Sequence, residues 1–414
     1  ALFGIPGQIR NFNSASKFVG PFFAKPKSQL VDFVNQTYDP ALKERVLTYW
    51  NMALEGKDVV PLVVQFAKDE LLEEEKVDDN LCRLICGHDY AYNIFLRMLC
   101  GGIMDAFVSH PYSSMVCMGV DPHSADWAVV AKKAFKFGSN RVLAGDLSKQ
   151  EASSSTDKRD AFIQAVSEEY NLNRIQHRFL SHALAGLNGF FVMFNMAVYL
   201  AMNGHSSGHT LTATFNCYDV FWMHKACFED LRPDPSYVFE DHVALQVLGD
   251  DSLGSVTKKV SSWYNMRTIS EWAAKLGITY TMGTDKKKEV IPFINSKEAI
   301  FLGRSFVFRE GLTQGPLRKV AINDLLTYSV KVSGYTPDQV RAIRTLQAFR
   351  ELVAHGPTVY NQYRDMVIRT QTERFGYAVQ IPPYEDYLDD LRGGWYKNDY
   401  NNVHLTSDVV HAMY

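Results

Sequence analysis

Residues 247–256 read VLGDDSLGSV, with two adjacent aspartates, Asp250 and Asp251, between two short apolar runs. The four residues between the runs, 249–252, are of types that form turns, so the pattern predicts a β-hairpin. Two interpretations of the aspartates are open at this point. They belong either to a solvated tight turn, which is the commoner case, or to a site for a divalent cation. The second case requires a further carboxylate and a phosphate-rich substrate.

The composition is that of an ordinary globular protein of 414 residues. Hydrophobic residues make up 46%, aromatic residues 13% and charged residues 21%, and the length allows two or three subdomains with a large core. The net charge of −3 gives no overall basic character, so a nucleic acid would have to bind in a local groove. Six cysteines in so long a chain do not suggest a disulfide framework and are typical of a reducing compartment.

Three local patterns have plain interpretations. Cys82, Cys86 and His88 form C-x3-C-x-H without a second ligand pair at zinc-like spacing, so we interpret the cysteines as buried thiols. Residues 182–202 have the length of a membrane span, but asparagines and glycines interrupt them, which favours a buried helix and no membrane span. The N-terminus lacks the layout of a signal peptide, and a start at Ala1 suggests release from a precursor or a truncated chain.

Strands and helices alternate irregularly along the chain. The patterns predict helices at 40–75, 91–108 and about 263–276, a strand before Asp146, a strand at 277–282, and mostly helix from 316 to about 372. This arrangement indicates an α+β fold with an antiparallel hairpin at its centre. No glycine-rich phosphate loop follows a first strand, which argues against a doubly wound fold.

The further carboxylate is Asp146, at the end of an apolar strand and 104 positions before Asp250. A carboxylate at a strand end beside a hairpin with two more is typical of a site for phosphoryl transfer with two metal ions. Crowded carboxylates repel each other, so the arrangement makes sense chiefly with a cation bound. Mg²⁺ suits a site with few protein oxygens, where water and phosphate complete the ligands.

These segments resemble, in order, motifs A to E of the viral RNA-dependent RNA polymerases, and most closely those of picornavirus-like, positive-strand RNA viruses. The segments that carry the likeness are AGDLSKQEASSS, SSGHTLTATFN, LGDDS, GITYTMGTDKK and IFLGRSF. Upstream, KDELLEEEKVDDNLCRLI resembles motif F near 68–85, and GVDPHSADW resembles a finger segment that precedes motif A. The likeness spans roughly residues 60–310 and is far more specific than two aspartates alone.

The resemblance implies a right-hand polymerase with fingers, palm and thumb. Its palm would carry an antiparallel sheet and its thumb would be mostly helical. The implied boundaries are fingers at 1–140 and 160–204, palm at 141–159 and 205–312, and thumb at 313–414.

The resemblance also implies roles in catalysis. Asp146 and Asp250 would be the primary ligands of two Mg²⁺ ions, for which Mn²⁺ can substitute, and Asp251 a lesser ligand. Lys286 would give a proton to the departing pyrophosphate.

Other motif residues would bind substrate. Glu151 would face the incoming ribose, and Ser207 and Asn216 would complete the hydrogen bonds around its 2′-hydroxyl. Gly208 would allow close approach of the loop to the substrate backbone, and Thr212 matches the motif's threonine. Lys68, Lys76 and Arg83 would pair with the triphosphate. Residues Phe301 to Arg304 would contact the primer end.

Taken singly, several of these residues have simpler interpretations. Ser207, Thr212 and Asn216 could form a helix cap with a polar face, and residues 286–288 could be a solvated run of charge. Lys68 and Glu70 could be neighbours on a surface. The shared order and spacing of the segments favour the functional interpretation.

The sequence departs from the family at four positions. Glu151 stands where aspartate is usual, Leu72 and Leu81 where arginine and lysine are usual, and Gly303 where a cation is commoner. The weakened motif F suggests an alternative, a polymerase-shaped RNA-binding protein with weak or no catalysis. A reverse transcriptase is disfavoured, because those enzymes tend to carry a bulky aromatic residue in place of Asn216.

The implied partners are an RNA template and primer, NTPs, a genome-linked protein primer and other viral replication proteins. The implied location is the host cell cytoplasm, in membrane-associated viral replication complexes.

Overall fold

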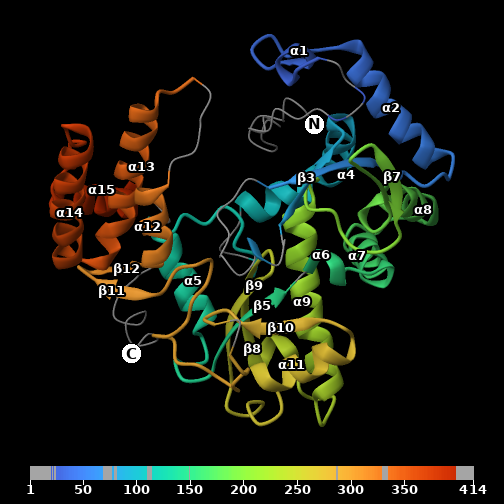
Figure 1. The fold of residues 1–414 in the computed structure, drawn as a ribbon. Helices are drawn as coiled ribbons and strands as arrows, with labels where there is room; N and C mark the ends of the chain where they lie inside the picture. Colours follow the sequence, from blue (N-terminus) through green and yellow to red (C-terminus); the bar gives the residue numbers. More distant parts are fainter. Residues whose placement is uncertain are drawn as a thin grey trace. The chain divides into compact units, whose positions relative to one another are not determined.

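A computed structural model of the chain describes residues 20, 22, 25–68, 77–78, 82–109, 114–148, 150–285, 288–328 and 334–397. The chain divides into two compact units, each built from several segments (Figure 1). Unit 1 comprises Ala1–His110, Leu147–Met223 and Ala274–Thr279, and unit 2 comprises Pro111–Asp146, His224–Ala273 and Tyr280–Tyr414. The two-way division does not test the predicted boundaries of fingers, palm and thumb.

Unit 1 combines helices with a four-stranded sheet of order β4-β3-β6-β7. β3 runs antiparallel to β4 and parallel to β6, and β6 and β7 form a hairpin. Its strands are β1 (Val31–Asp32), β2 (Thr37–Tyr38), β3 (Leu62–Ala67), β4 (Leu84–His88), β6 (Phe190–Phe194) and β7 (Ala197–Ala201). Its helices are α1 (Lys27–Leu30), α2 (Pro40–Leu54), α4 (Tyr90–Ser109), α6 (Gln150–Ser153), α7 (Thr156–Glu169), α8 (Arg174–Ala183), η1 (Ala185–Leu187) and the first part of α9 (Thr212–Leu231).

The helix predicted at 40–75 is shorter than expected. α2 begins with an Asp39 cap that accepts a hydrogen bond from the Ala41 amide, and it ends at Leu54. Gly56 then adopts a φ of +74°, which glycine tolerates and which ends a helix. The following residues 62–67 form β3, so the extension to residue 75 was wrong.

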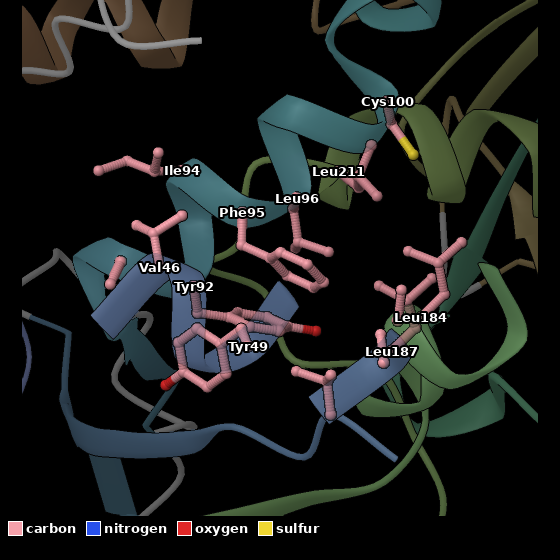
Figure 2. Close-up of a cluster of buried hydrophobic side chains, with 14 of the residues drawn as sticks. Val46, Tyr49, Tyr92, Ile94, Phe95, Leu96, Cys100, Leu184, Leu187 and Leu211 are labelled. Carbon is pink, nitrogen blue, oxygen red and sulfur yellow. The ribbon is translucent and has the colours of Figure 1, made fainter. Parts of the chain in front are cut away.

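A large core of unit 1 lies where α2, α4 and α8 meet. Figure 2 shows Tyr49 of α2 beside Tyr92 and Phe95 of α4, with Leu184 and Leu187 facing them from the other side. By length and composition, α4 is the one helix in the described residues that could cross a membrane. A helix in the centre of a hydrophobic core meets the same criterion, and Tyr92 and Phe95 are fully buried here.

The buried helix predicted at 182–202 was wrong as well. α8 ends at Ala183, and the apolar run then forms the β6–β7 hairpin, with Asn195 and Met196 both at positive φ in its two-residue turn. A continuous apolar run does not distinguish a buried helix from a strand by periodicity, which explains the error. The turn of the hairpin is exposed, with Met196 at 99%, whereas Phe190 and Val192 of β6 are buried.

Unit 2 contains a second four-stranded sheet, of order β10-β5-β9-β8, and most of the C-terminal helices. α5 packs against β8 and β9. The strands are β5 (Val142–Ser148), β8 (Val243–Leu248), β9 (Asp251–Val256), β10 (Thr279–Met282), β11 (Val307–Arg309) and β12 (Leu312–Gln314). The helices are α5 (Asp126–Ala134), α10 (Phe239–His242), α11 (Met266–Lys275), α12 (Lys319–Thr327), α13 (Pro337–Leu352), η2 (Val353–His355), α14 (Pro357–Phe375) and α15 (Tyr384–Lys397).

The predicted central hairpin, the helix near 263–276, the strand at 277–282 and the helical C-terminal part are confirmed in this unit. α12 to α15 share one core, in which Phe349, Leu352 and Tyr360 are fully buried. Of the two predicted buried thiols, Cys86 is buried but Cys82 is exposed, because Cys82 precedes β4 and does not lie within it.

Candidate active site

The two adjacent aspartates lie at the tip of the β8–β9 hairpin. Leu248 pairs with Asp251, so the loop consists of Gly249 and Asp250 alone, two residues shorter than the sequence pattern suggested. Gly249 has a φ of +63° and Asp250 does not have a positive φ, the combination of a type II′ turn, which requires glycine at its first central position. The turn therefore leaves Asp250 exposed at the tip and places Asp251 in the first position of β9.

Strand pairing sets the third carboxylate, Asp146, opposite Asp251. β5 runs antiparallel to β9, and Asp146 lies directly opposite Asp251. Residues opposite each other in such a pair have Cα atoms about 4.5–5.5 Å apart and side chains on the same face of the sheet. Asp146 is buried, with 4% of its surface exposed, whereas Asp251 is half-buried.

The backbone behind these carboxylates is tightly packed. A side chain at Gly145 would overlap the Tyr280 ring of β10, so only glycine fits before Asp146. The Ser252 hydroxyl donates to the Gly145 carbonyl at 3.2 Å and contacts His224 Nε2 at 3.2 Å. Burial lowers the pKa of His224 to about 3, so the imidazole is neutral near pH 7. This network joins β5, β9 and α9 behind Asp146 and Asp251.

The donor set suits a hard cation with few protein ligands. Among the residues that the structure describes, no three His, Cys, Asp or Glu side chains converge closely enough to form a cage around a metal ion. Mg²⁺ commonly binds through one or two carboxylates and takes its other ligands from water and substrate phosphates. Asp146 with the Asp250–Asp251 pair offers carboxylate oxygens of that kind on adjacent strands.

The segments that carry the candidate sugar-binding residues lie in unit 1 and are connected by hydrogen bonds. The His205 amide donates to the Glu151 carbonyl at 2.7 Å, and the Gly204 amide donates to the Ser154 carbonyl at 3.1 Å. The Gln150 amide side chain donates to the Asn216 carbonyl at 3.0 Å. Hydrogen bonds therefore connect α6 with the loop at 203–211 and with the first turns of α9. Roles in sugar binding stay predictions.

Within this group the individual residues differ in role. Glu151 is exposed, while Ser207 and Asn216 are half-buried. The Thr212 hydroxyl donates to the His209 carbonyl at 2.9 Å, which agrees with its simpler interpretation as part of a helix start. A side chain at Gly208 would overlap the Cys86 carbonyl of β4, so here glycine allows close approach to the protein's own backbone.

Three buried histidines lie in or against this loop: His205 and His209 belong to it, and His88 ends β4. His88 Nε2 is 2.7 Å from the Ser206 hydroxyl, and the His88 ring stacks on Tyr92 with centroids 5.7 Å apart. His209 packs edge-on against both His88 and His205. Burial lowers the pKa of His88 to about 3 and that of His205 to about 4, so these rings are neutral near pH 7.

The structure describes only some of the residues predicted to bind the triphosphate or to donate a proton. Lys68 and Arg83 are neighbours at the ends of β3 and β4, where the Lys68 amide donates to the Arg83 carbonyl at 2.9 Å. Lys76 and Lys286 lie outside the described residues, as do Leu72 and Leu81. The roles of these residues stay predictions.

Arg304 contacts protein carboxylate and carbonyl groups. Its guanidinium forms two hydrogen bonds with Glu351 of α13, at 2.6 and 2.8 Å, and one with the Gly315 carbonyl at 2.9 Å. The ion pair is largely buried. Contact of Arg304 with a primer stays a prediction, and the observed contacts favour a role in fixing the turn at 301–304.

The sequence pattern did not single out Ser206, Ser252, His224 or Glu351. His88 stood out only as a candidate zinc ligand. Ser206 and Ser252 each adjoin a motif residue, which was the available signal, but their histidine partners lie 118 and 28 positions away.

The sequence matches the family model described as viral RNA-dependent RNA polymerase over residues 7–371. It is 24% identical to the replicase polyprotein of Acute bee paralysis virus (strain Rothamsted) over 369 residues, which cover 85% of this chain and 19% of that polyprotein. It is 26% identical to the RNA1 polyprotein of Beet ringspot virus over 344 residues, covering 78% of this chain and 15% of the polyprotein. The chain thus spans about a fifth or less of these relatives.

The fold is also similar to a solved structure titled Sicinivirus 3Dpol RNA dependent RNA polymerase. The TM-score is 0.78, with 95% of this chain and 80% of that chain covered. The sequence identity is 18%, so this likeness concerns the fold. It confirms the predicted α+β, right-hand polymerase class.

Proposed function

The chain belongs to the viral RNA-dependent RNA polymerase family, and from this membership and the carboxylate geometry we propose how it works. It extends an RNA 3′ end on an RNA template in the genome replication of a positive-strand RNA virus, and each addition of an NTP releases pyrophosphate. The enzyme class predicted from the motifs, an RNA-directed RNA polymerase, agrees with the family. The single observation that carries the proposal is the strand register that sets Asp146 opposite Asp251, with Asp250 in the adjoining two-residue turn.

Asp146 and Asp250 are the proposed primary ligands of two Mg²⁺ ions, with Asp251 as a lesser ligand. Bound there, the ions would stabilise the charge that develops on the attacking 3′-hydroxyl and on the leaving pyrophosphate. The carboxylates lie on paired strands and a tight turn, so the backbone itself limits how far they can separate. Tyr280 and Ser252 pack behind them and limit shifts of β5 and β9.

The chemical step forms one bond and breaks another. The primer 3′-oxygen bonds to the α-phosphorus of the NTP and loses its proton, and the bond from that phosphorus to the pyrophosphate breaks. Lys286 is the proposed donor of a proton to the pyrophosphate. Lys68, Lys76 and Arg83 are the proposed partners of the triphosphate.

Selection of ribose is assigned to the hydrogen-bonded group in unit 1. Glu151, Ser207 and Asn216 carry polar side chains within a segment joined by the Gln150–Asn216 and His205–Glu151 hydrogen bonds. A site that hydrogen-bonds a hydroxyl rejects an analogue lacking it, because its own polar groups then lose a partner.

The test is incorporation of labelled NTP on a homopolymer RNA template, with and without primer, in Mg²⁺ and in Mn²⁺. We expect template-dependent incorporation that requires a divalent cation and is lost in Asp250→Asn. RNA binding without incorporation under any of these conditions would favour the alternative, a polymerase-shaped RNA-binding protein. Preference for dNTPs would indicate a reverse transcriptase.

We further propose that the protein acts in the host cell cytoplasm, in membrane-associated replication complexes. Its proposed partners are other viral replication proteins and a genome-linked protein primer. The relatives that are replicase polyproteins support a setting among other replication proteins.

A further inference from the structure

The turn at residues 301–304 has an unusual backbone for its sequence. Phe301 and Arg304 exchange hydrogen bonds of 2.9 and 3.0 Å, so Leu302 and Gly303 form a two-residue turn. Their φ values are +54° and +73°, as in a type I′ turn. Leucine seldom adopts a positive φ, so the surrounding structure has to stabilise this turn.

Arg304 supplies much of that stabilisation. Its guanidinium binds both carboxylate oxygens of Glu351, and one of its nitrogens also donates to the Gly315 carbonyl. Two-point pairing of this kind fixes both the position and the plane of an arginine. The backbone on either side is tied as well, because the Arg318 amide donates to the Gly303 carbonyl at 3.1 Å.

Glu351 is the centre of this cluster. Besides Arg304 it contacts His123 Nε2, at 3.1 Å from Oε1. Burial alone would raise the pKa of Glu351, but the hydrogen bonds and charges of His123 and Arg304 outweigh burial and lower it to about 2. The carboxylate is therefore ionised at any pH at which the protein would be assayed.

The turn acts on the candidate metal site. The Leu302 amide donates to Asp251 Oδ2 at 3.2 Å, across 51 positions of sequence. One oxygen of Asp251 is thus fixed by the turn, which determines the direction in which the other oxygen points. Asp251 lies opposite Asp146 in the strand pair.

We propose that Glu351 is a positioning residue for Asp251: it fixes Arg304, Arg304 fixes the 301–304 turn, and the turn presents the Leu302 amide to the carboxylate. This inference rests on the proposed function, since it treats Asp251 as part of the metal site. Hydrogen-bond partners of metal ligands commonly affect metal affinity or activity by about 10- to 100-fold when they are removed. A helix far from the motifs in sequence therefore influences the metal site.

Two variants weaken the connection while keeping side chains of similar size. Glu351→Gln removes the charge, and Arg304→Lys keeps the charge but removes the two-point pairing. Asp338→Asn is the matched control, because Asp338 pairs with Arg341 at 2.7 Å in an exposed place near the start of the same helix, whereas Glu351 lies near its end. Thermal unfolding of each variant establishes that it is folded.

Three quantities are measured: kcat for primer extension with its Mg²⁺ dependence, the Kd for primer–template, and Mn²⁺ binding to the protein alone by electron paramagnetic resonance. We expect Glu351→Gln and Arg304→Lys to lower kcat about 10-fold and to weaken Mn²⁺ binding by a similar factor. The Kd for primer–template should not change in either variant, and Asp338→Asn should match wild type. The double variant should be no worse than the more affected single variant, because the two residues act through one contact.

Opposite results would overturn the inference. If Arg304 grips RNA directly, Arg304→Lys weakens primer–template binding and Glu351→Gln leaves Mn²⁺ binding unchanged. Failure of the proposed function looks different, because wild type would then bind Mn²⁺ without incorporating NTP. In that case the Mn²⁺ measurements on the variants still decide the role of Glu351.

Discussion

The carboxylate hairpin of unit 2 and the 203–211 loop of unit 1 position their polar side chains by different means. The backbone positions of Asp146, Asp250 and Asp251 are set by strand register and a two-residue turn. Glu151 and Asn216 belong to segments connected by a few hydrogen bonds from side chains and loop amides. A conservative replacement in the hairpin should therefore change the chemistry and spare the geometry. In the loop region a replacement can change both.

The largest effect is expected at the carboxylates. Asp250→Asn and Asp146→Asn should lower the rate of incorporation by more than about 10³-fold, roughly 4 kcal/mol in activation free energy, because the amide is a poor ligand for a hard cation. The thermal midpoint should change little, since neither side chain is part of the apolar core. Asp241→Asn, at an exposed carboxylate of α10, is the control. A variant at 146 or 250 that kept more than about a tenth of the wild-type rate would contradict the metal assignment.

The next effect concerns proton delivery. Lys286→Leu should slow the chemical step by about 10²-fold, the lower end of the usual range for general acid catalysis, with RNA binding little changed. Lys288 is the control within the same run, since it forms an ion pair with Asp285 at 3.3 Å. Single-turnover rates on a pre-bound primer–template measure the difference. Equal losses at both lysines would mean that the run acts only as an electrostatic patch.

Discrimination between ATP and dATP tests the proposed role of the 203–211 loop and the segments bonded to it. Asn216→Ala removes one group assigned to the 2′-hydroxyl, so the ratio of kcat/KM for ATP over dATP should fall about 10- to 100-fold, on the order of 1.4–3 kcal/mol. The loss should come mainly from ATP. Glu151→Asp shows whether the longer carboxylate of this chain contributes. An unchanged ratio in Asn216→Ala would remove the sugar-reading role from this region.

The smallest effect is expected at His88, which hydrogen-bonds Ser206 of the loop and packs edge-on against His209. His88→Phe keeps the ring stacked on Tyr92 but loses the 2.7 Å hydrogen bond, so the ATP/dATP ratio should fall about 2- to 10-fold, as for one hydrogen bond. Adding Ser206→Ala should recover part of the loss, because the hydroxyl is then no longer buried without its partner. If both single changes leave the ratio unaltered, this contact does not position the loop.

The sequence predicted the parts of the fold that depend on local pattern. The hairpin at 247–256, the strand that carries Asp146 and the C-terminal helices all follow from apolar periodicity and turn residues, although β5 continues past Asp146 to Ser148. The order of the motifs was enough to predict the family. The error at 182–202 arose because an uninterrupted apolar run fits both a helix and a strand, and only pairing with β3 and between β6 and β7 decides between them.

The partners of the site residues could not be predicted in the same way. Arg304 and Glu351 lie 47 positions apart, and His88 and Ser206 lie 118 positions apart. No spacing rule connects such pairs, because the packing of whole helices and strands creates them. The burial that lowers the histidine pKa values is likewise a property of the folded chain.

The β5–β9 pairing also determines when, during synthesis of the chain, the sheet can form. Asp146 and its partner Asp251 are 105 positions apart, and residues 147–223 of unit 1 are synthesised between them. At about 5–20 residues per second, a ribosome takes roughly 5–20 s to pass from one aspartate to the other. Throughout that interval β5, whose residues 142–147 are buried in the finished sheet, has neither of its neighbouring strands, β9 and β10. The proposed metal site therefore forms only after β9 has been synthesised and has paired with β5, and β10 completes the sheet later still.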